Sequence, residues 1–252
     1  MGSINFEFYG DGFMGNRGVD FIDSKEVELA FKKYKRELLD VFMLKNGFKK
    51  YKNNSYIRLN DLYFVEYVDL QKEHYGSKTF TVNVSRFPLY VPVSTTVDGV
   101  AILPLMGKRL GNIIAEREFW WDYYNYDVAF KSFKNIVDGM EKYLLPWFER
   151  YNDEQLYLDG MLKVLFKDGR NVKEITHLHL KNNQIQLARD FLNYLHSSDF
   201  GIKLSEKRKN IFYNSLKNMS DLVSGIDNAC EYINGVMKKN IIDLKLPISF
   251  NR

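Results

Sequence analysis

Three short segments of strand-forming residues follow one another closely in the first third of the chain, and they constrain the fold most. They are joined by short turn-forming links and occupy residues 55–60, 62–70 and 78–86. Links of this length connect antiparallel neighbours, because a parallel pair needs a crossover of about a dozen residues or more. The sequence therefore predicts an antiparallel sheet, and we expect a fourth strand between residues 97 and 105.

Amphipathic helical patterns lie on both sides of these segments. The first predicted helix covers residues 24–45 and ends at Asn46-Gly47, a pair suited to a left-handed helix end. The second covers residues 126–151 and contains Pro146, which we expect to kink or restart it. The predicted fold class is α+β, a helix-flanked antiparallel sheet of about four strands with a helical C-terminal extension.

From residue 152 onward the pattern is mainly helical, with helices predicted over 171–180, 183–197 and 205–239. The last of these has apolar residues that alternate spacings of four and three, namely Phe212, Leu216, Met219, Val223, Ile226, Cys230, Ile233 and Met237. Its apolar stripe is broader than a coiled-coil seam, so we expect this helix to pack inside its own chain against residues 183–197. A monomer is therefore favoured.

The sequence divides into three parts. A Gly-rich lead-in covers residues 1–23, an α+β domain covers 24–151, and a mainly helical region covers 152–252.

Composition points to a soluble protein of the cytoplasm. Of its 252 residues, 45% are hydrophobic, which is enough for an ordinary core. The longest apolar run, residues 100–106, is far shorter than the roughly 20 residues that a spanning helix needs. The N-terminus lacks the basic and apolar regions of a signal peptide, and the single cysteine excludes an internal disulfide. We therefore expect no contact with a membrane.

The chain is mildly basic, with a formal net charge of +4. One basic run contains aromatic residues, a combination that can track a phosphate backbone and stack on bases, and it comprises Lys45, Phe48, Lys49, Lys50, Tyr51, Lys52 and Arg58. The same run could be a solvated corner between helix and strand. About half of the basic residues stand beside acids and no named nucleic-acid motif occurs, so nucleic acid is not the expected partner.

Several patterns suggest a cofactor or catalysis, but the structure predicted around each of them does not fit that function. Gly10-x-Gly12-x-x-Gly15 fits a dinucleotide fingerprint, but the predicted helix begins too late to place its amides on a pyrophosphate. His177 and His179 would share one face only on a strand, whereas a helix is predicted there. Cys230 falls in an apolar stripe, where a thiol is inert. We expect no catalytic residue, no metal and no cofactor.

A charged pair is predicted inside the sheet. Glu66 lies in one row with Phe64 and Val68, and Arg86 ends a similar apolar row on the next predicted strand. A carboxylate on a buried face needs a cationic or hydrogen-bonding partner, so we expect Glu66 to pair with Arg86 or Arg58. A structural ion pair is favoured over a catalytic carboxylate.

Residues 116–127, EREFWWDYYNYD, are the most aromatic part of the chain. Six of the eight residues from 119 to 126 are aromatic, and no regular element can turn all of them inward. We expect one of the adjacent tryptophans to anchor the core and the other to contact a protein partner, with acidic residues around it that suit a basic partner. The predicted surface consists of Trp120, Trp121, Tyr123, Tyr124, Glu118 and Asp122.

Several short motifs between residues 25 and 151 resemble a bacterial family known as domain of unknown function 4304. In chain order the motifs are Gly47-Phe48, Tyr56-x-Arg58, Gln71-Lys72, Phe80-Thr81-x-Asn83, Arg109-Leu110-Gly111 and Trp120-Trp121. The lead-in and the C-terminal hundred residues have no counterpart in this resemblance. Since the family has no established activity, the resemblance supports the fold and implies no function.

Three functions remain open. The leading hypothesis is a non-catalytic bacterial interaction module, by analogy with small proteins of toxin-neutralising or phage-related systems. The alternative is a nucleic-acid-binding or nucleic-acid-processing protein, and the third is a small-molecule hydrolase.

Overall fold

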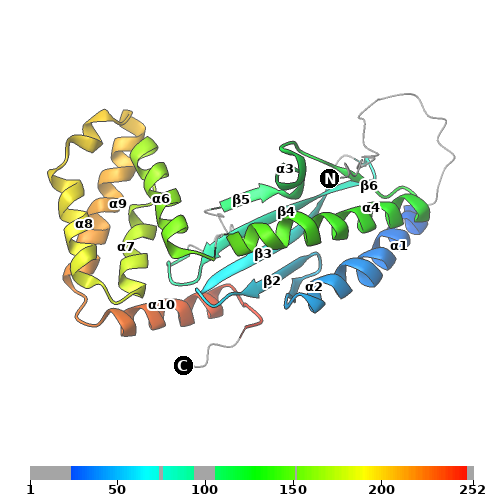
Figure 1. Cartoon of the computed structure of the whole chain (residues 1–252), viewed down its shortest axis with the longest axis horizontal. Coiled ribbons are helices and arrows are strands. Elements are labelled where there is room, and N and C mark those ends of the chain that lie inside the picture. Colours follow the sequence, from blue (N-terminus) through cyan, green and yellow to red (C-terminus); the bar gives the residue numbers. More distant parts are fainter. Residues whose placement is uncertain (1–23, 74–75, 94–105, 151, 249–252) are drawn as a thin grey trace, which may run out of the picture. The chain divides into compact units, whose positions relative to one another are not determined.

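Two compact units make up the structure (Figure 1). The computed structural model describes residues 24–73, 76–93, 106–150 and 152–248, and all structural statements concern these residues. Within them, the first unit comprises residues 24–58, 66–86 and 106–149, and the second comprises the rest. The chain passes from the first unit to the second for the last time between residues 149 and 150, close to the boundary predicted at residue 151. Residues 59–65 and 87–93, which we assigned to the α+β domain, cluster with the second unit.

An antiparallel sheet of six strands, most of which belongs to the first unit, confirms the predicted α+β class. The strands are β1 (Lys49–Lys52), β2 (Ser55–Leu59), β3 (Phe64–Lys72), β4 (Thr79–Pro88), β5 (Met106–Arg109) and β6 (Trp121–Asp122). Their order is β1-β2-β3-β4-β5, with β6 also beside β4. The three strands predicted first are confirmed as β2, β3 and β4. The strand expected between residues 97 and 105 lies outside the described residues, and β5 begins at Met106.

Strand β3 begins two residues later than predicted because of a tight turn. The side chain of Asn60 accepts hydrogen bonds from the backbone N–H groups of Leu62, at 3.1 Å, and Phe64, at 2.9 Å. Tyr63 between them has a φ of 63°, in the left-handed region. Asparagine favours turns of this kind because its side chain replaces a backbone acceptor.

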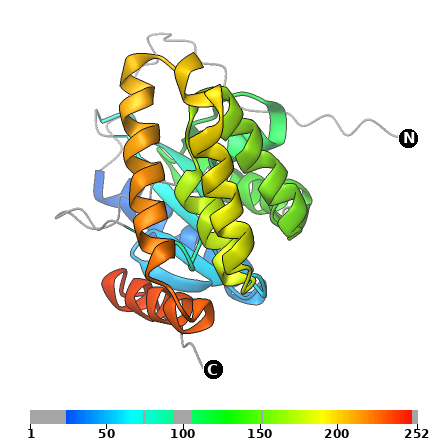
Figure 2. The same cartoon turned by 90° about the vertical axis from the view of Figure 1, so that its left-hand side faces the viewer.

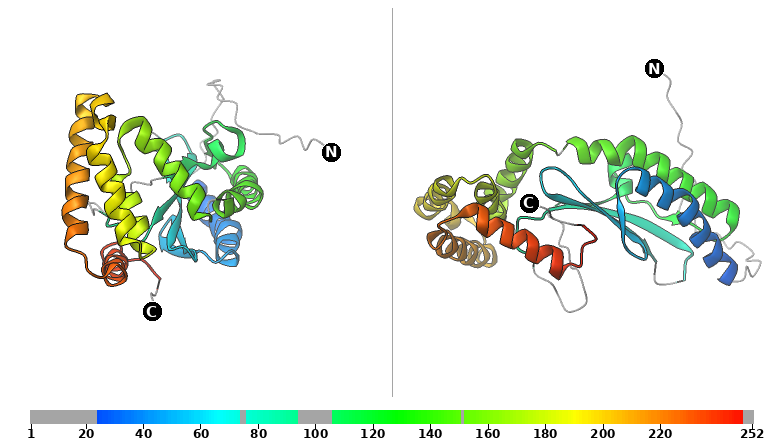
Figure 3. Two further views of the ribbon diagram at one scale, coloured as in Figure 1. Left: turned by 60° about the vertical axis from the view of Figure 1, so that its left-hand side comes forward. Right: turned by 90° about the horizontal axis from the view of Figure 1, so that it is seen from below.

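The first unit carries its long helices side by side on one face of the sheet (Figure 3). The helix predicted over 24–45 is α1 (Ser24–Tyr34), the π-helical η1 (Lys35–Asp40) and α2 (Val41–Lys45), and Gly47 after it has the expected left-handed φ of 79°. The helix predicted over 126–151 is α4 (Tyr126–Gly139), the π-helical η2 (Met140–Leu144) and α5 (Leu145–Arg150). Pro146 has no N–H to donate to the turn before it. A wider π turn therefore precedes Pro146, where we expected the helix to kink or restart. A short helix, α3 (Leu110–Ala115), follows β5.

Aromatic rings fill the space between these helices and the sheet. Phe80 of β4 stacks on Phe133 of α4, with ring centroids 5.1 Å apart, and Phe31 of α1 meets both rings edge-on. All three side chains are at most 1% exposed. Val82 and Val84 belong to the same core, so the alternate residues of β4 point to the opposite face.

The second unit is mainly helical (Figure 2). Its elements are α6 (Glu154–Asp168), α7 (Val172–Lys181), α8 (Ile185–Ser197), the 3-10 helix η3 (Asp199–Lys203), α9 (Glu206–Ser224) and α10 (Ala229–Asp243). The helices predicted over 171–180 and 183–197 are confirmed as α7 and α8. Helix α9 packs against α7 and α8, and α10 packs against α7.

The single helix predicted over 205–239 is wrong, because the chain breaks between α9 and α10. Gly225 ends α9, and the side chain of Asn228 accepts a hydrogen bond from the backbone N–H of Glu231 at 3.2 Å, which caps the start of α10. The break changes the helical phase, so Cys230 is exposed instead of lying in the apolar stripe. The other seven residues of the predicted stripe are buried. The monomeric state remains a prediction.

A buried carboxylate joins the first helix to the sheet. Asp40, only 5% exposed, lies 3.2 Å from Lys35 Nζ and 2.5 Å from Lys50 Nζ, and it accepts a hydrogen bond from the hydroxyl of Tyr56. The π turn places Lys35 beside Asp40, five residues later. Burial acts to raise the pKa of Asp40, but the hydrogen bonds from Lys50 and Tyr56 and the charge of Lys35 outweigh it and lower that pKa.

We expect Asp40→Asn to lower the free energy of unfolding by about 3 kcal/mol at pH 7, because it leaves buried donors without their anion. A carboxyl group whose pKa is lowered on folding contributes stability above its unfolded pKa, and this contribution is lost as pH falls through the folded pKa. The difference from the native protein should therefore shrink on acidification, as measured by urea unfolding at a series of pH values. Asp127→Asn, at an exposed position, is the control. Equal stability of Asp40→Asn and the native protein at pH 7 would contradict the role of this carboxylate.

Candidate partner-binding surface

Polar side chains gather on the face of the sheet that points away from α1 and α4. Asn83 of β4 lies directly opposite Arg109 of β5 in the strand register. The side-chain amide of Asn83 donates a hydrogen bond to Gln71 of β3 at 3.0 Å. The register and this bond bring three strands together at one polar site.

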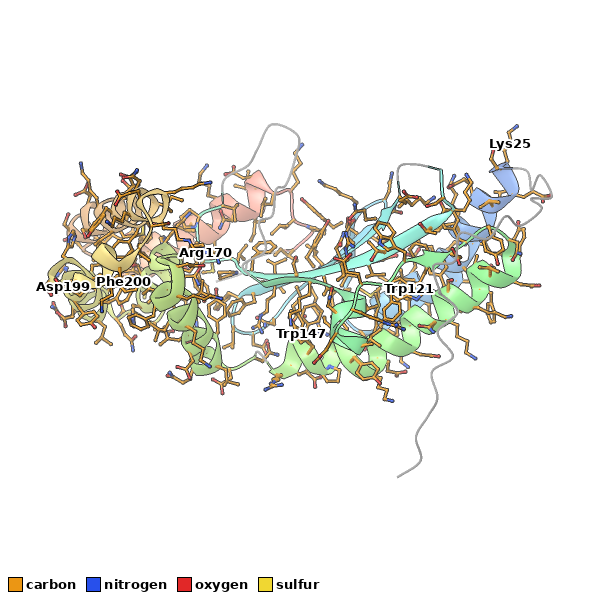
Figure 4. The ribbon with its side chains drawn as sticks, turned by 90° about the horizontal axis from the view of Figure 1, so that it is seen from above. Lys25, Trp121, Trp147, Arg170, Asp199 and Phe200 are labelled. Atoms are coloured by element: carbon orange, nitrogen blue, oxygen red, sulfur yellow. The ribbon has the colours of Figure 1, made fainter. Side chains whose placement is uncertain are left out.

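The two adjacent tryptophans point to opposite faces of the sheet. Trp121 pairs with Phe80 in the register of β4 and β6, and it is 7% exposed in the core (Figure 4). Trp120 precedes it and is half-buried, with the guanidinium of Arg109 5.1 Å from its ring centroid. Arg109 also forms an ion pair with Glu118, whose side chain is 61% exposed. We name Gln71, Asn83, Arg109, Glu118 and Trp120 the Trp120 surface.

The structure divides the residues that were predicted as one surface. Tyr123 is 4% exposed and packs on Phe31, with ring centroids 5.0 Å apart. Its hydroxyl donates to Glu28 at 3.5 Å, and burial together with the charge of Glu28 raises its pKa to about 12. Tyr124 and Asp122 are half-buried. Trp120 and Glu118 therefore lie together, whereas Trp121 and Tyr123 belong to the core.

Three members of the Trp120 surface were not predicted as site residues. Gln71, Asn83 and Arg109 belong to the motifs of the family resemblance, and their polar character alone does not single them out. The available signal is the alternation of β4, which places Asn83 on the face opposite the core. The register that sets Arg109 beside Asn83 comes from the tertiary structure.

The predicted charged pair is present in the sheet as Glu66 and Arg58. Glu66 is 0% exposed, and its Oε2 atom accepts a hydrogen bond from Arg58 Nε at 2.6 Å. Arg58 also donates to the carbonyl of Asn46 at 2.9 Å and covers the ring of Phe48 at 4.6 Å. Arg86, the other candidate, is 1% exposed and lies 3.4 Å from the carbonyl oxygen of Phe148.

Burial raises the pKa of Glu66 above its usual value, although the charges of Arg58 and Arg86 act to lower it. The charge of Glu149 adds to the upward shift. The Oε1 atom is buried and has no hydrogen-bond partner among the described residues. Because the whole side chain is enclosed and one oxygen is held by Arg58, this arrangement fits a structural pair better than a group that meets a substrate.

The histidines have structural surroundings. His177 is 0% exposed, with Nδ1 2.7 Å from the carbonyl oxygen of Lys173 and Nε2 3.0 Å from the hydroxyl of Tyr232. Burial lowers its pKa to about 4, so the ring is neutral at pH 7. His179 is half-buried and lies 3.2 Å from Gln184, on a different side of α7.

Among the residues that the structure describes, no group of three or more His, Cys, Asp or Glu residues is arranged to hold a metal ion. No helix among them has the length and apolar content to span a bilayer. The Gly10-x-Gly12-x-x-Gly15 motif lies outside this part of the chain.

The basic run begins at the corner between α2 and the edge strand β1 and continues into β2. Lys49 and Lys52 of β1 are exposed, whereas Lys50 is bound to Asp40 and Arg58 to Glu66. Lysines on an edge strand hinder its pairing with other chains. The run therefore has a structural explanation, and its cations do not form one continuous phosphate-binding row.

Comparison with known proteins identifies part of the chain. Residues 39–150 match the family model described as Domain of unknown function (DUF4304). This match confirms the family resemblance, and the matched DUF4304 segment includes the Trp120 surface and the Glu66–Arg58 pair. Neither the curated proteins nor the solved structures contain a match to the chain.

We expect Glu66→Gln to change the pH dependence of stability in the opposite sense to Asp40→Asn. The folded pKa of Glu66 is raised, so the stability that its protonated form contributes is lost as pH rises from the unfolded pKa through the folded pKa. The free energy of unfolding of the native protein should carry this decrease, and that of Glu66→Gln should not. Denaturant unfolding between pH 4 and 8 measures both profiles. Parallel profiles would show that Glu66 does not titrate in this way.

Proposed function

We propose that the DUF4304 segment is a non-catalytic binding module that docks a protein partner on the Trp120 surface. The observation that carries this proposal is the fixed and accessible pair of Trp120 and Arg109. The ring is half-buried, the guanidinium lies 5.1 Å from its centroid, and Glu118 forms an ion pair with the guanidinium. Tryptophan and arginine dominate binding hot spots because they give large contact areas.

The chemistry around Trp120 favours a partner with basic groups. Glu116 and Glu118 are exposed and precede Trp120 in the chain, and Arg109 pairs with Glu118 in the free protein. A lysine or arginine of the partner can compete for Glu118, because that side chain is 61% exposed. The amides of Gln71 and Asn83 offer additional donors and acceptors to a partner backbone.

The surroundings of the ionisable groups support binding over hydrolysis. The most enclosed ones are engaged in structural contacts, with Asp40 bound to Lys35, Lys50 and Tyr56, and Glu66 bound to Arg58. A role in toxin-neutralising or phage-related systems is part of the same proposal and rests on analogy alone. The exposed thiol of Cys230 favours a reducing compartment such as the cytoplasm.

Alanine variants of the two tryptophans separate binding from stability. We expect Trp121→Ala to lower the free energy of unfolding by about 3 to 5 kcal/mol, because it empties a buried site. Trp120→Ala should remain within about 1 kcal/mol of the native protein, since its ring contacts the core less. Urea unfolding of both variants measures these changes.

The binding experiment uses a partner protein that is first identified by co-purification with the native protein. Isothermal titration should then show that Trp120→Ala and Arg109→Ala each weaken binding by roughly 30-fold, which corresponds to about 2 kcal/mol. Tyr194→Ala, at a 58% exposed aromatic residue of α8, is the matched control. If Trp120→Ala binds the partner as tightly as the native protein, the docking surface lies elsewhere.

A further inference from the structure

A group of aromatic rings lies at the surface of the second unit, where α6 ends and α9 begins. Phe200 of η3 contacts Phe166 of α6 and Phe212 of α9, with ring centroids 5.8 and 5.4 Å apart (Figure 4). Tyr213 lies against the backbone of Gly201, where an added Cβ would come within 2.4 Å of its hydroxyl. Phe212 is fully buried, but Phe166 is 53% exposed and Tyr213 is 45% exposed.

The segments that carry these rings are rich in basic residues. We define the basic tip as residues 163–170, 199–203 and 206–213, which contain seven lysines and arginines and three acids. The excess of seven over three is four, equal to the formal net charge of the entire chain. Two of the three acids are already neutralised, Asp168 by Arg170 at 2.6 Å and Glu206 by Lys209 at 2.7 Å. These segments therefore carry a net positive charge, most of which acids within them do not neutralise.

Fold stability does not explain this composition. Lys207, Arg208 and Lys209 stand in the first turn of α9, where the helix dipole disfavours cations. Lys209 pairs with Glu206 in that turn and the charge of Arg208 acts on Asp168, whereas Lys207 has no ion-pair partner among the described residues. The side chain of Phe166 also contributes little to the stability of the fold, because more than half of its surface remains in water. Because these rings and cations add little to the stability of the helix, their presence indicates that a ligand contacts this surface.

We propose that the basic tip binds single-stranded nucleic acid. Exposed rings can stack on bases while lysines hold the phosphates, and this combination is typical of sites that bind single strands without sequence preference. An acidic protein would use the cations without requiring flat rings. An anionic membrane would favour mainly aliphatic side chains beside the cations, whereas two of the three large exposed apolar side chains of the tip, Phe166 and Tyr213, are aromatic and only Ile211 is aliphatic. Single-stranded nucleic acid uses both features.

The fold brings together cations at this surface that lie far apart in the sequence. Some of them stand beside acids in the sequence, such as Lys207 after Glu206, but Glu206 pairs with Lys209. At the tip, Lys203 and Lys207 are exposed and have no ion-pair partner among the described residues. This proposal is independent of the Trp120 surface, which lies in the first unit.

The test uses the full-length protein and a fluorescently labelled, unstructured oligothymidylate. Fluorescence anisotropy should show binding that weakens as salt rises, because phosphate contacts release counterions. The double variant K203E/K207E should weaken binding and reduce the steepness of the salt dependence, by about 0.7 in log–log slope for each phosphate that the protein no longer neutralises. Phe166→Ala should weaken binding about tenfold at constant salt, and Phe166→Tyr should restore most of that affinity.

Matched variants separate a site from general attraction. K32E/K33E makes the same charge change on exposed lysines of α1, and Tyr194→Ala removes an exposed ring from α8. Both should bind like the native protein, and circular dichroism should show that all variants are folded. The proposal is overturned if the oligonucleotide does not bind at low salt, or if the controls weaken binding equally. Tighter binding to polyglutamate or to vesicles containing phosphatidylserine would also overturn it.

Discussion

The first unit depends on the two faces of β4, the strand that pairs with β3, β5 and β6. One face supplies Phe80 to the aromatic core, and the other supplies Asn83 to the polar group around Arg109. The pairing of Phe80 with Trp121 sends Trp121 into the core and leaves Trp120 on the opposite face. A register shift of one residue would exchange the two tryptophans. The Trp120 surface is therefore a consequence of the pairing that builds the core.

The two buried carboxylates show how the number of donors decides the direction in which burial shifts a pKa. Asp40 has Lys35, Lys50 and Tyr56 around it, and together they outweigh the desolvation that acts on its charge. Glu66 has one direct partner in Arg58, and desolvation prevails. Both groups hold sheet and neighbouring segments together, and neither is placed to meet a substrate.

The sequence predicted the elements whose hydrophobic periodicity is strong. It did not predict the contacts that depend on pairing between distant segments. Alternating residues predicted β2, β3 and β4, whereas the lysines of β1 resembled a corner because an edge strand needs few apolar residues. The break between α9 and α10 was missed because the apolar spacing continues across Gly225 and Asn228, although both residues are signals for a helix boundary. At the candidate site, adjacency alone predicted that Trp120 and Trp121 diverge. The contact of Arg109 with Trp120 depends on pairing between distant segments.

The two proposed surfaces differ in the physical basis of their binding. At the Trp120 surface, Arg109 and Glu118 neutralise each other, so affinity there depends on contact area and hydrogen bonds more than on net charge. The basic tip has an excess of cations, so its affinity depends on the counterions that a polyanion releases. Added salt screens the second mechanism far more than the first. A chain with both surfaces can therefore keep a protein partner bound while the salt concentration controls its affinity for nucleic acid.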